Sequence, residues 1–305
     1  MSLLDRAVSL VLPAVPKPIV GYFSRRYIAG PSMDDAFRVT RALAARGAMA
    51  TLDILGEFIT TSEEAAQNTQ AYLDLLHAIP RSGLRQVNVS VKLTALGLLL
   101  EPSPCLENTR RLVAAAHELD NFVRIDMEDA QCTSRTIDVY RTLRAEFPGT
   151  VGLVLQARLR RTLQDVWDLT REPANFRICK GIYVEPRAIA YTDREIIRRN
   201  FTRVLEAMLD RGAYVGIATH DELLVWEALD LVSRRGLAPE QYEFQMLLGV
   251  DEALRDILLA AGHRLRVYVP YGEQWYAYSV RRLRENPQIA GYAFKAILKL
   301  SLIHI

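Results

Sequence analysis

Short apolar runs rich in β-forming residues recur along this chain, and each is followed by a stretch with helical spacing of its apolar residues. Eight such runs occur, and their starts lie 22 to 37 residues apart. They are ATLDILG from Ala50, QVNVSVKL from Gln86, NFVRIDMED from Asn121, VGLVLQA from Val151, FRICKGIY from Phe176, AYVGIATH from Ala213, YEFQMLLG from Tyr242 and RLRVYVPYG from Arg264. Strands that alternate with helices at this spacing indicate βαβ units and a parallel sheet.

Eight such units within about 250 residues match a (β/α)8 barrel of the TIM type. A doubly wound sheet is the alternative, but it usually carries a GxGxxG turn after its first strand, and this sequence has none. We therefore expect a single domain: an N-terminal helical extension over residues 1–48 and a catalytic barrel over 49–305.

Helix start signals separate the runs. We expect four of them: Ser32 with Asp35, Thr61 with Glu64, Ser103 before Pro104, and Thr192 with Glu195. Gly212 is expected to follow the end of the helix that begins near Thr192.

Composition excludes several classes of protein. The 305 residues are 50% hydrophobic and 24% charged with a net charge of +2, which is typical of a globular protein and too balanced for a nucleic-acid footprint. Three cysteines without CxxC spacing indicate reduced thiols in a cytoplasmic protein. No apolar run is long enough to span a bilayer, and the N-terminal stretch lacks the features of a signal peptide.

Polar residues alternate with apolar ones in several runs, so that they share one face of a strand. The polar faces are Asn88, Ser90 and Lys92; Arg124, Asp126 and Glu128; Val154 and Gln156; and Gln245 and Leu247. In a barrel these faces point inward and carry the chemistry at the carboxyl ends of the strands. We expect Lys92 to pair with Asp126; a purely structural ion network inside the barrel is the alternative.

The segment EQWYAYSVRRLRENP follows the eighth run and is predicted to be a helix. Tyr278, Arg281, Arg282 and Glu285 lie on one face of it. Two adjacent arginines beside a tyrosine can hold a small carboxylate by bidentate hydrogen bonds. The alternative is a solvated basic face.

At these residues the sequence resembles the proline dehydrogenase family from about residue 30 to 295. The resemblance rests on VSVKLTALG, RIDMED, VLQA, RICKGIY, ATHD, QMLLG, RVYVPYG and YSVRRLRENP, in that order. It implies a distorted barrel with the eighth helix over its mouth and a non-covalently bound FAD. It also implies hydride transfer from C5 of L-proline to flavin N5, which gives Δ1-pyrroline-5-carboxylate, and passage of the electrons to a membrane quinone.

The resemblance also implies roles for individual residues. Lys92, Asp126 and Arg177 would be catalytic. The substrate would be held by Lys92, Leu247, Tyr268, Tyr278, Arg281 and Arg282, and supported or gated by Glu57 and Glu285. The flavin would be held by Asp126, Val154, Gln156, Arg177, Lys180, Gly181, Tyr183, Thr219, His220 and Gln245. Ile182 and Asp221 depart from the residues that the family often has at these positions, alanine and asparagine.

Three other interpretations remain open at this point. A lysine, Lys92 or Lys180, could form a Schiff base in an aldolase-type lyase. The barrel could be a carboxylate-binding regulator without catalysis. A metal site at Asp126, Glu128, His220 and Asp221 lacks the usual ligand spacing, and we expect none. Bound flavin would argue against the first two, and borohydride trapping would favour the lyase.

A quinone acceptor implies contact with the inner face of a membrane by a cytoplasmic protein. The C-terminal FKAILKLSLIHI could lie on that surface, or it could pack on the barrel or form a disordered tail. The product could pass to a pyrroline-5-carboxylate dehydrogenase. We expect no nucleic-acid partner.

Overall fold

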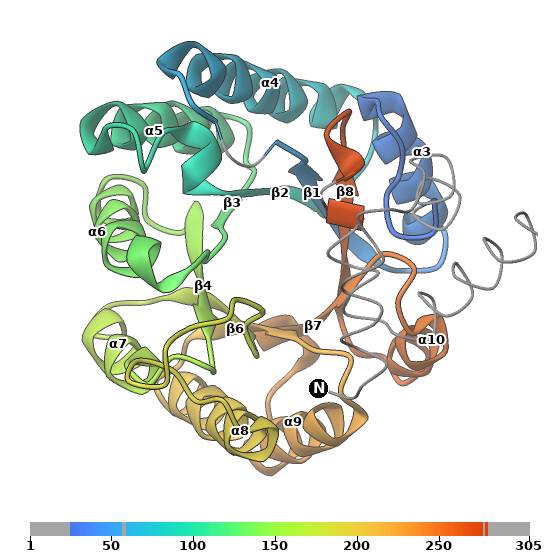
Figure 1. The fold of residues 1–305 in the computed structure, drawn as a ribbon. Helices are drawn as coiled ribbons and strands as arrows, with labels where there is room; N and C mark the ends of the chain where they lie inside the picture. The colour runs from blue at the N-terminus through green and yellow to red at the C-terminus, as the bar shows by residue number, and fades with distance from the viewer. Residues whose placement is uncertain (1–24, 57–58, 277, 280–305) are drawn as a thin grey trace, which may run out of the picture.

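The fold is a closed barrel of parallel strands surrounded by helices (Figure 1). The structure, a computed structural model, describes residues 25–56, 59–276, 278 and 279. Within that part of the chain, eight strands pair in chain order and β1 closes the barrel against β8. The strands are β1 (Met49–Ile54), β2 (Val87–Val91), β3 (Val123–Ile125), β4 (Val151–Gln156), β5 (Asn175–Cys179), β6 (Tyr214–Ala218), β7 (Tyr242–Leu247) and β8 (Leu265–Tyr271). The predicted barrel is confirmed: six strands fall within their predicted runs, and β1 and β5 begin one residue before theirs, at Met49 and Asn175.

Helices form an outer ring around the strands (Figure 1). They are α3 (Met33–Ala44), α4 (Ser62–Arg81), α5 (Pro102–Glu118), α6 (Ala130–Glu146), α7 (Thr162–Leu169), α8 (Arg194–Asp210), α9 (Glu222–Arg234) and α10 (Glu252–Ala260). Two short 3-10 turns, η2 (Leu93–Leu96) and η3 (Pro239–Gln241), follow β2 and precede β7. The first of these helices, α3, precedes β1 and packs against β1 and β8.

The hydrophobic core lies between the strands and this ring of helices. Val89 and Val91 on β2 have no exposed surface, and neither do Phe201 and Val204 on α8. Burying a side chain of this size contributes roughly 1.5–3 kcal/mol. Because the outward strand faces supply this core, the inward faces are free to carry polar residues.

Two of the four predicted helix starts are confirmed. Ser32 and Thr61 form capping boxes with Asp35 and Glu64. The prediction at Ser103 is wrong: the helix begins two residues earlier, with Pro102 at its first turn and Glu101 as N-cap. Proline at the first turn is favoured because it has no N–H group to satisfy there.

The start of α8 also differs from the prediction. Its N-cap is Asp193 rather than Thr192, and the Asp193 carboxylate accepts hydrogen bonds from the N–H groups of Glu195 (2.9 Å) and Ile196 (3.0 Å). Aspartate is a stronger N-cap than threonine, and its charge is also favoured at the positive end of the helix dipole. Gly212, at φ +70°, follows α8 as predicted.

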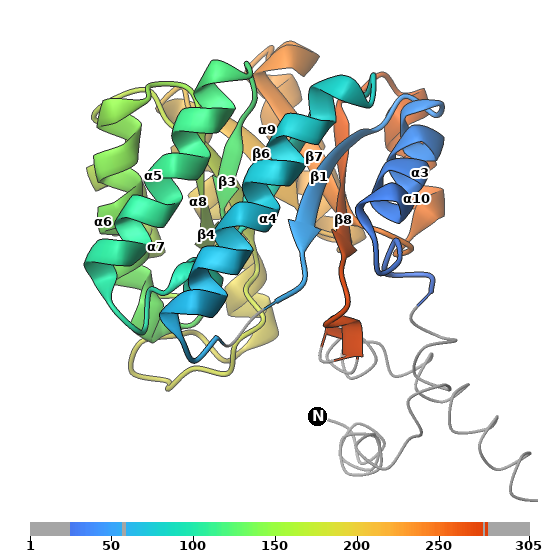
Figure 2. The same ribbon diagram turned by 90° about the horizontal axis from the view of Figure 1, so that it is seen from above.

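The carboxyl ends of the strands all lie at one end of the barrel. Figure 2 shows the arrowheads of β1 and β8 at that end. Residues that follow the strands, such as Lys92 and Lys180, are therefore collected around a single mouth. Among the described helices, none is both long and apolar enough to cross a bilayer.

Candidate active site

The site is built by side chains that point into the barrel from alternate positions of the strands. On β1 these are Thr51 and Asp53, and on β2 they are Ser90 and, directly after the strand, Lys92. In the strand register Asp53 lies opposite Ser90. Their neighbours Leu52 and Val91 face the helices and are fully buried.

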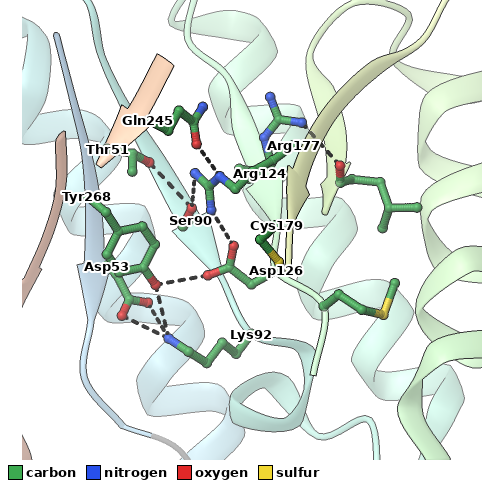
Figure 3. Close-up of polar contacts among 12 residues, drawn as sticks. Thr51, Asp53, Ser90, Lys92, Arg124, Asp126, Arg177, Cys179, Gln245 and Tyr268 are labelled. Carbon is green, nitrogen blue, oxygen red and sulfur yellow. Dashed lines mark hydrogen bonds and ion pairs between the residues drawn. The ribbon is translucent and has the colours of Figure 1, made fainter. Parts of the chain in front are cut away.

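Lys92 is bound by a carboxylate that the sequence analysis did not name. Its Nζ lies 2.8 Å from both carboxylate oxygens of Asp53 (Figure 3). The predicted pair of Lys92 with Asp126 is therefore wrong. The register between β2 and β3 does bring the two residues to neighbouring positions, because Val91 pairs with Ile125 and the next residues along the chain are Lys92 and Asp126. The Asp126 carboxylate is instead taken by Arg177, whose Nη1 lies 2.7 Å away.

Tyr268 connects the two ion pairs. Its hydroxyl accepts a hydrogen bond from Lys92 (3.3 Å) and donates one to Asp126 (2.9 Å). Burial, together with the charges of Asp126 and Asp53, raises the pKa of Tyr268 well above its ordinary value, so the phenol keeps its proton. The Arg177 guanidinium lies over the Tyr268 ring, 5.4 Å from its centroid. The result is one chain of alternating charges across the barrel mouth.

Arg177 also links the mouth to the interior below it. Its Nη2 donates to Ser90 (3.2 Å) and its Nε donates to the amide oxygen of Gln245. The Gln245 amide nitrogen donates in turn to Glu243. Both ends of the Gln245 amide therefore have protein partners, and they fix its orientation.

Buried charge continues below this level. Arg266 binds Glu243 through Nε (2.8 Å) and Nη2 (3.1 Å). Burial alone would raise the pKa of Glu243, but Arg266 outweighs it and lowers the pKa to about 2. Burial and the nearby Arg177 lower the pKa of Arg124 to about 9. Among the described residues, Arg266 and Glu243 thus form a third ion pair below the two at the mouth, and Gln245 links it to Arg177.

Positions that the resemblance assigns to a flavin lie along β4 to β7. Val154 and Gln156 on β4 are both buried. The Gln156 amide donates to the carbonyl of Glu128 (2.6 Å), which holds the end of β3 against β4. The Glu128 carboxylate itself accepts a hydrogen bond from the backbone N–H of Thr94 (3.0 Å).

After β5 the backbone at Gly181 packs directly against the side chain of Gln156. This glycine has φ +92°, and a Cβ there would lie 2.5 Å from Oε1 of Gln156. Any other residue would therefore be strained and would displace Gln156. Arg158 lies against the same point and binds the carbonyl of Tyr183. Its Nε is a buried donor with no hydrogen-bond partner among the described residues, which fits an anionic or polar ligand.

Lys180 and Asp221 form an ion pair at the end of β5. Nζ of Lys180 lies 2.9 Å from the Asp221 carboxylate, and the Nε of Arg198 lies 2.8 Å from the same oxygen. Burial would raise the pKa of Asp221, but hydrogen bonds from these two cations lower it. The family often has asparagine at position 221. In this chain the aspartate there has two cationic partners, and its charge offsets one of the two adjacent positive charges.

Thr219 and His220 are held by the backbone around them. Thr219 Oγ1 accepts from the N–H of Asp221 (3.1 Å), and His220 Nε2 accepts from the N–H of Leu247 (2.9 Å). This contact fixes His220 with its Nε2 unprotonated and turned toward β7. Leu247, predicted to pack on the substrate, is thereby tied to β6.

The predicted last helix is described only at its start. Tyr278 is buried in a small cluster with Tyr27, Ile28 and Leu55. Four predicted site residues lie outside the described residues: Glu57, Arg281, Arg282 and Glu285.

Sequence reasoning missed Asp53, Glu243 and Arg266. The signal that could have found them is the alternation already used for β2, because Thr51 and Asp53, and Glu243 and Gln245, are two residues apart. The helix residue Tyr72 carries no such signal: its hydroxyl reaches Asp53 (3.3 Å) only because α4 packs beside β1.

The ion pairs bear on the alternative chemistries. A Schiff-base lysine must be a neutral amine, whereas Lys92 and Lys180 each face a carboxylate at 2.8–2.9 Å that favours the ammonium form. Among the described residues, no group of three or more His, Cys, Asp or Glu side chains is arranged to hold a metal. The arrangement suits an organic ligand at a mouth with fixed hydrogen-bond donors.

Comparison with known proteins assigns this barrel to a family. The model of the family "Proline dehydrogenase" matches residues 36–293. The chain is 36% identical to the proline dehydrogenase of Deinococcus radiodurans over 280 residues, which cover 90% of each chain. It is 34% identical to proline dehydrogenase 1 of Bacillus subtilis over 276 residues, which cover 90% of this chain and 91% of that one.

Solved structures share the fold. Proline utilization A from Bdellovibrio bacteriovorus, inactivated by N-propargylglycine, matches with a TM-score of 0.83 and 26% identity. The match covers 87% of this chain but only 32% of that longer one. Proline utilization A from Bradyrhizobium japonicum matches at 22% identity with a TM-score of 0.75, which shows the barrel fold alone. From the family match and the identity over nine-tenths of its length, the chain belongs to the proline dehydrogenase family.

Proposed function

We propose that this protein oxidises L-proline to Δ1-pyrroline-5-carboxylate, the first step of proline catabolism, with FAD as its cofactor. The observation that carries the proposal is the ordered chain Lys92–Tyr268–Asp126–Arg177 at the mouth of a barrel that belongs to this family. Each of these residues occupies a position that the resemblance assigns to the active site.

The substrate end of the site follows from the residues on the last helix. Arg281 and Arg282 hold the proline carboxylate, Glu285 and Glu57 steady or gate these arginines, and Tyr278 and Leu247 pack on the ring. Two guanidinium groups on one carboxylate convert binding energy into a fixed orientation of the ring carbon that reacts. Support comes from the burial of Tyr278 at the start of this helix and from the position of Leu247 at the end of β7.

The cofactor end lies along β4 to β7. Val154 supplies an apolar contact, and hydrogen-bond donors stand beside it on Gln156, Arg177, Lys180, His220 and Gln245. The orphaned donor of Arg158 fits a large ligand with polar edges at this point. Asp126, Tyr183 and Thr219 complete the predicted set. When bound, a flavin supplies the acceptor for the hydride that leaves proline C5.

The protein's own residues provide orientation and electrostatics. Arg177 is held on three sides, by Asp126, Ser90 and Gln245, so its guanidinium is fixed before any ligand arrives. A fixed cation stabilises negative charge that develops beside it without further reorganisation. Neither Lys92 nor Asp126 is required as a general base. Both already have partners, and the proline ammonium can lose its proton to water.

The proposal extends to organisation and partners. Residues 49–305 form the catalytic barrel and residues 1–48 its extension; the start of β1 at Met49 supports this division. The electrons pass to a membrane quinone, by contact of a cytoplasmic protein with the inner face of the membrane. The product passes to a pyrroline-5-carboxylate dehydrogenase.

Cofactor release and one substitution test the proposal. We expect the denatured protein to release FAD rather than FMN in equimolar amount, measured by chromatography. We expect Arg281→Met to keep the flavin but to lose roughly 2–4 kcal/mol in kcat/KM for proline, chiefly through KM, because a charge-assisted contact to the carboxylate is gone. Unchanged kinetics in this variant would remove Arg281 from the substrate site, and FMN in the released fraction would refute the cofactor assignment.

A further inference from the structure

Asp53 is the most deeply buried charge at the barrel mouth. Its exposed fraction is 0%, and it lies on β1, outside the set of residues that the family resemblance names. A carboxylate removed from water is costly unless charges and hydrogen bonds compensate it. Lys92 provides that compensation, with its Nζ at 2.8 Å from both oxygens.

Asp53 is also held from outside the barrel. The Tyr72 hydroxyl, which comes from α4, donates to Oδ1 of Asp53 (3.3 Å) and accepts from the N–H of Ile54 (3.1 Å). Burial and the charge of Asp53 raise the pKa of Tyr72 well above its ordinary value, so this hydroxyl remains a donor. The carboxylate is thus placed by α4 and β1 together, independently of Lys92.

The charged and titratable groups around Lys92 come from four strands. Asp53 on β1 contacts the ammonium directly, and Tyr268 on β8 accepts from it. Asp126, after β3, and Arg177, on β5, lie one step farther along the chain of contacts that Figure 3 shows. Because Arg177 already binds Asp126, Asp53 is the carboxylate in direct contact with Lys92 among the residues that the structure describes.

We propose that Asp53 is a positioning residue: it keeps Lys92 cationic and aims its ammonium at Tyr268, and so fixes the donor direction of the Tyr268 hydroxyl toward Asp126. This role deepens the proposed function and rests on it. Without the Asp53 charge, Lys92 loses the carboxylate at 2.8 Å, and a buried ammonium that loses a neighbouring negative charge gives up its proton more readily. The Tyr268 hydroxyl then no longer has to accept a hydrogen bond from an ammonium group, and it can turn away from Asp126.

The first test observes Lys92 itself and needs neither proline nor turnover. The sequence holds only five lysines, so selective 13Cε labelling gives few signals, and a Lys92→Arg variant assigns the one of interest. In Asp53→Asn we expect the Lys92 midpoint to lie at least about one pH unit below its midpoint in the native protein. The same midpoint in both proteins would overturn the proposal.

A matched control uses the other lysine–aspartate pair. Asp221→Asn removes a carboxylate that pairs with Lys180 and Arg198, and it should leave the Lys92 midpoint in place. Movement of the Lys92 signal in this control would show a general electrostatic effect and would overturn the specific role of Asp53.

The second test covers the case in which Asp53→Asn does not fold. Asp53→Asn is introduced into a Lys92→Met protein, where the carboxylate no longer has a cation to balance and its removal leaves no unpaired charge. If Asp53 acts through Lys92, kcat/KM for proline in the double variant equals that of Lys92→Met alone. A further loss of tenfold or more would show an independent role and would overturn the proposal.

Where the single variant folds, its pH profile gives a third readout. We expect the alkaline limb of kcat/KM to move to lower pH in Asp53→Asn, in step with the Lys92 titration. A uniform loss of activity with an unmoved limb would contradict the proposal. Failure of the proposed function is distinguishable, because it would abolish proline oxidation in the native protein while the Lys92 titration would remain as expected.

Discussion

At the scale of single residues, the charges on either side of the buried Tyr268 hydroxyl set the direction of its hydrogen bonds. Tyr268 has a cation on one side and a carboxylate on the other, so its hydroxyl accepts from Lys92 and donates to Asp126. Its raised pKa keeps the proton in place across the physiological range. The phenol therefore transmits the arrangement of one ion pair to the other.

Removing that hydroxyl tests its contribution. We expect Tyr268→Phe to keep the fold and the flavin but to lower kcat/KM for proline by about ten- to a hundredfold, since one hydrogen bond to a charged partner is worth roughly 1.5–3 kcal/mol. The measurement is steady-state kinetics with an artificial acceptor. Tyr140→Phe is the control, because Tyr140 is a buried tyrosine on α6 whose hydroxyl has no hydrogen-bond partner among the described residues. Equal effects of the two substitutions would contradict the role of Tyr268.

Glu243 shows how the lower ion pair contributes to stability. We expect Glu243→Gln to lower the free energy of unfolding by about 3–5 kcal/mol at pH 7, because Arg266 is left as an uncompensated buried charge. The pKa of Glu243 is lowered to about 2 by Arg266, whereas an unfolded glutamate titrates near pH 4.3. The stabilisation by Glu243 is therefore complete above about pH 4.3 and is lost as the pH falls toward about 2.

Urea unfolding at several pH values measures this difference. The gap between the native protein and Glu243→Gln should be largest near neutral pH and should shrink below about pH 4. A gap that does not change between neutral and acidic pH would show that the Glu243 charge is not what stabilises the barrel.

At the scale of elements, the sequence predicted which segments are helices and strands better than it predicted where they begin. Strands were found because their outward faces must be apolar and β-rich, and because helical spacing follows each of them. The start of α8 was misplaced because both Thr192 and Asp193 can act as an N-cap. Only the backbone geometry decides between them, and it places the Asp193 carboxylate on the first free N–H groups.

Two alanine substitutions distinguish the caps. We expect Asp193→Ala to lower the free energy of unfolding by about 1 kcal/mol. Its neighbour Thr192→Ala should have almost no effect, because Thr192 does not cap the helix. Thermal or urea unfolding of both variants provides the measurement. A larger loss in Thr192→Ala than in Asp193→Ala would contradict the observed start of α8.

At the scale of the whole molecule, closure of the barrel decides which inward residues meet. Strand alternation predicts that Lys92 and Asp126 point inward, and the register between β2 and β3 brings them to neighbouring positions. It cannot predict that Arg177, from two strands away on β5, binds Asp126 and leaves Lys92 to Asp53. Such a choice depends on the length of each side chain and on the interior diameter. The family resemblance supplied the residues of the mouth, but not the partners that hold them.

The same closure gives the molecule a single mouth at which substrate and cofactor residues converge. The Lys92–Tyr268–Asp126–Arg177 chain crosses it, and the predicted flavin positions border it along β4 to β7. A barrel of this kind has one place where proline oxidation can occur. The central claim is therefore that one site binds both the flavin and proline.

Anaerobic addition of L-proline to the purified protein tests this claim most directly. We expect a yellow protein whose visible flavin absorbance is bleached by proline in the absence of any other electron donor. This result would establish the cofactor, the substrate and the reductive half of the reaction together. A yellow protein that proline does not bleach would contradict proline as the substrate, and a colourless protein that takes up no FAD would contradict the account as a whole.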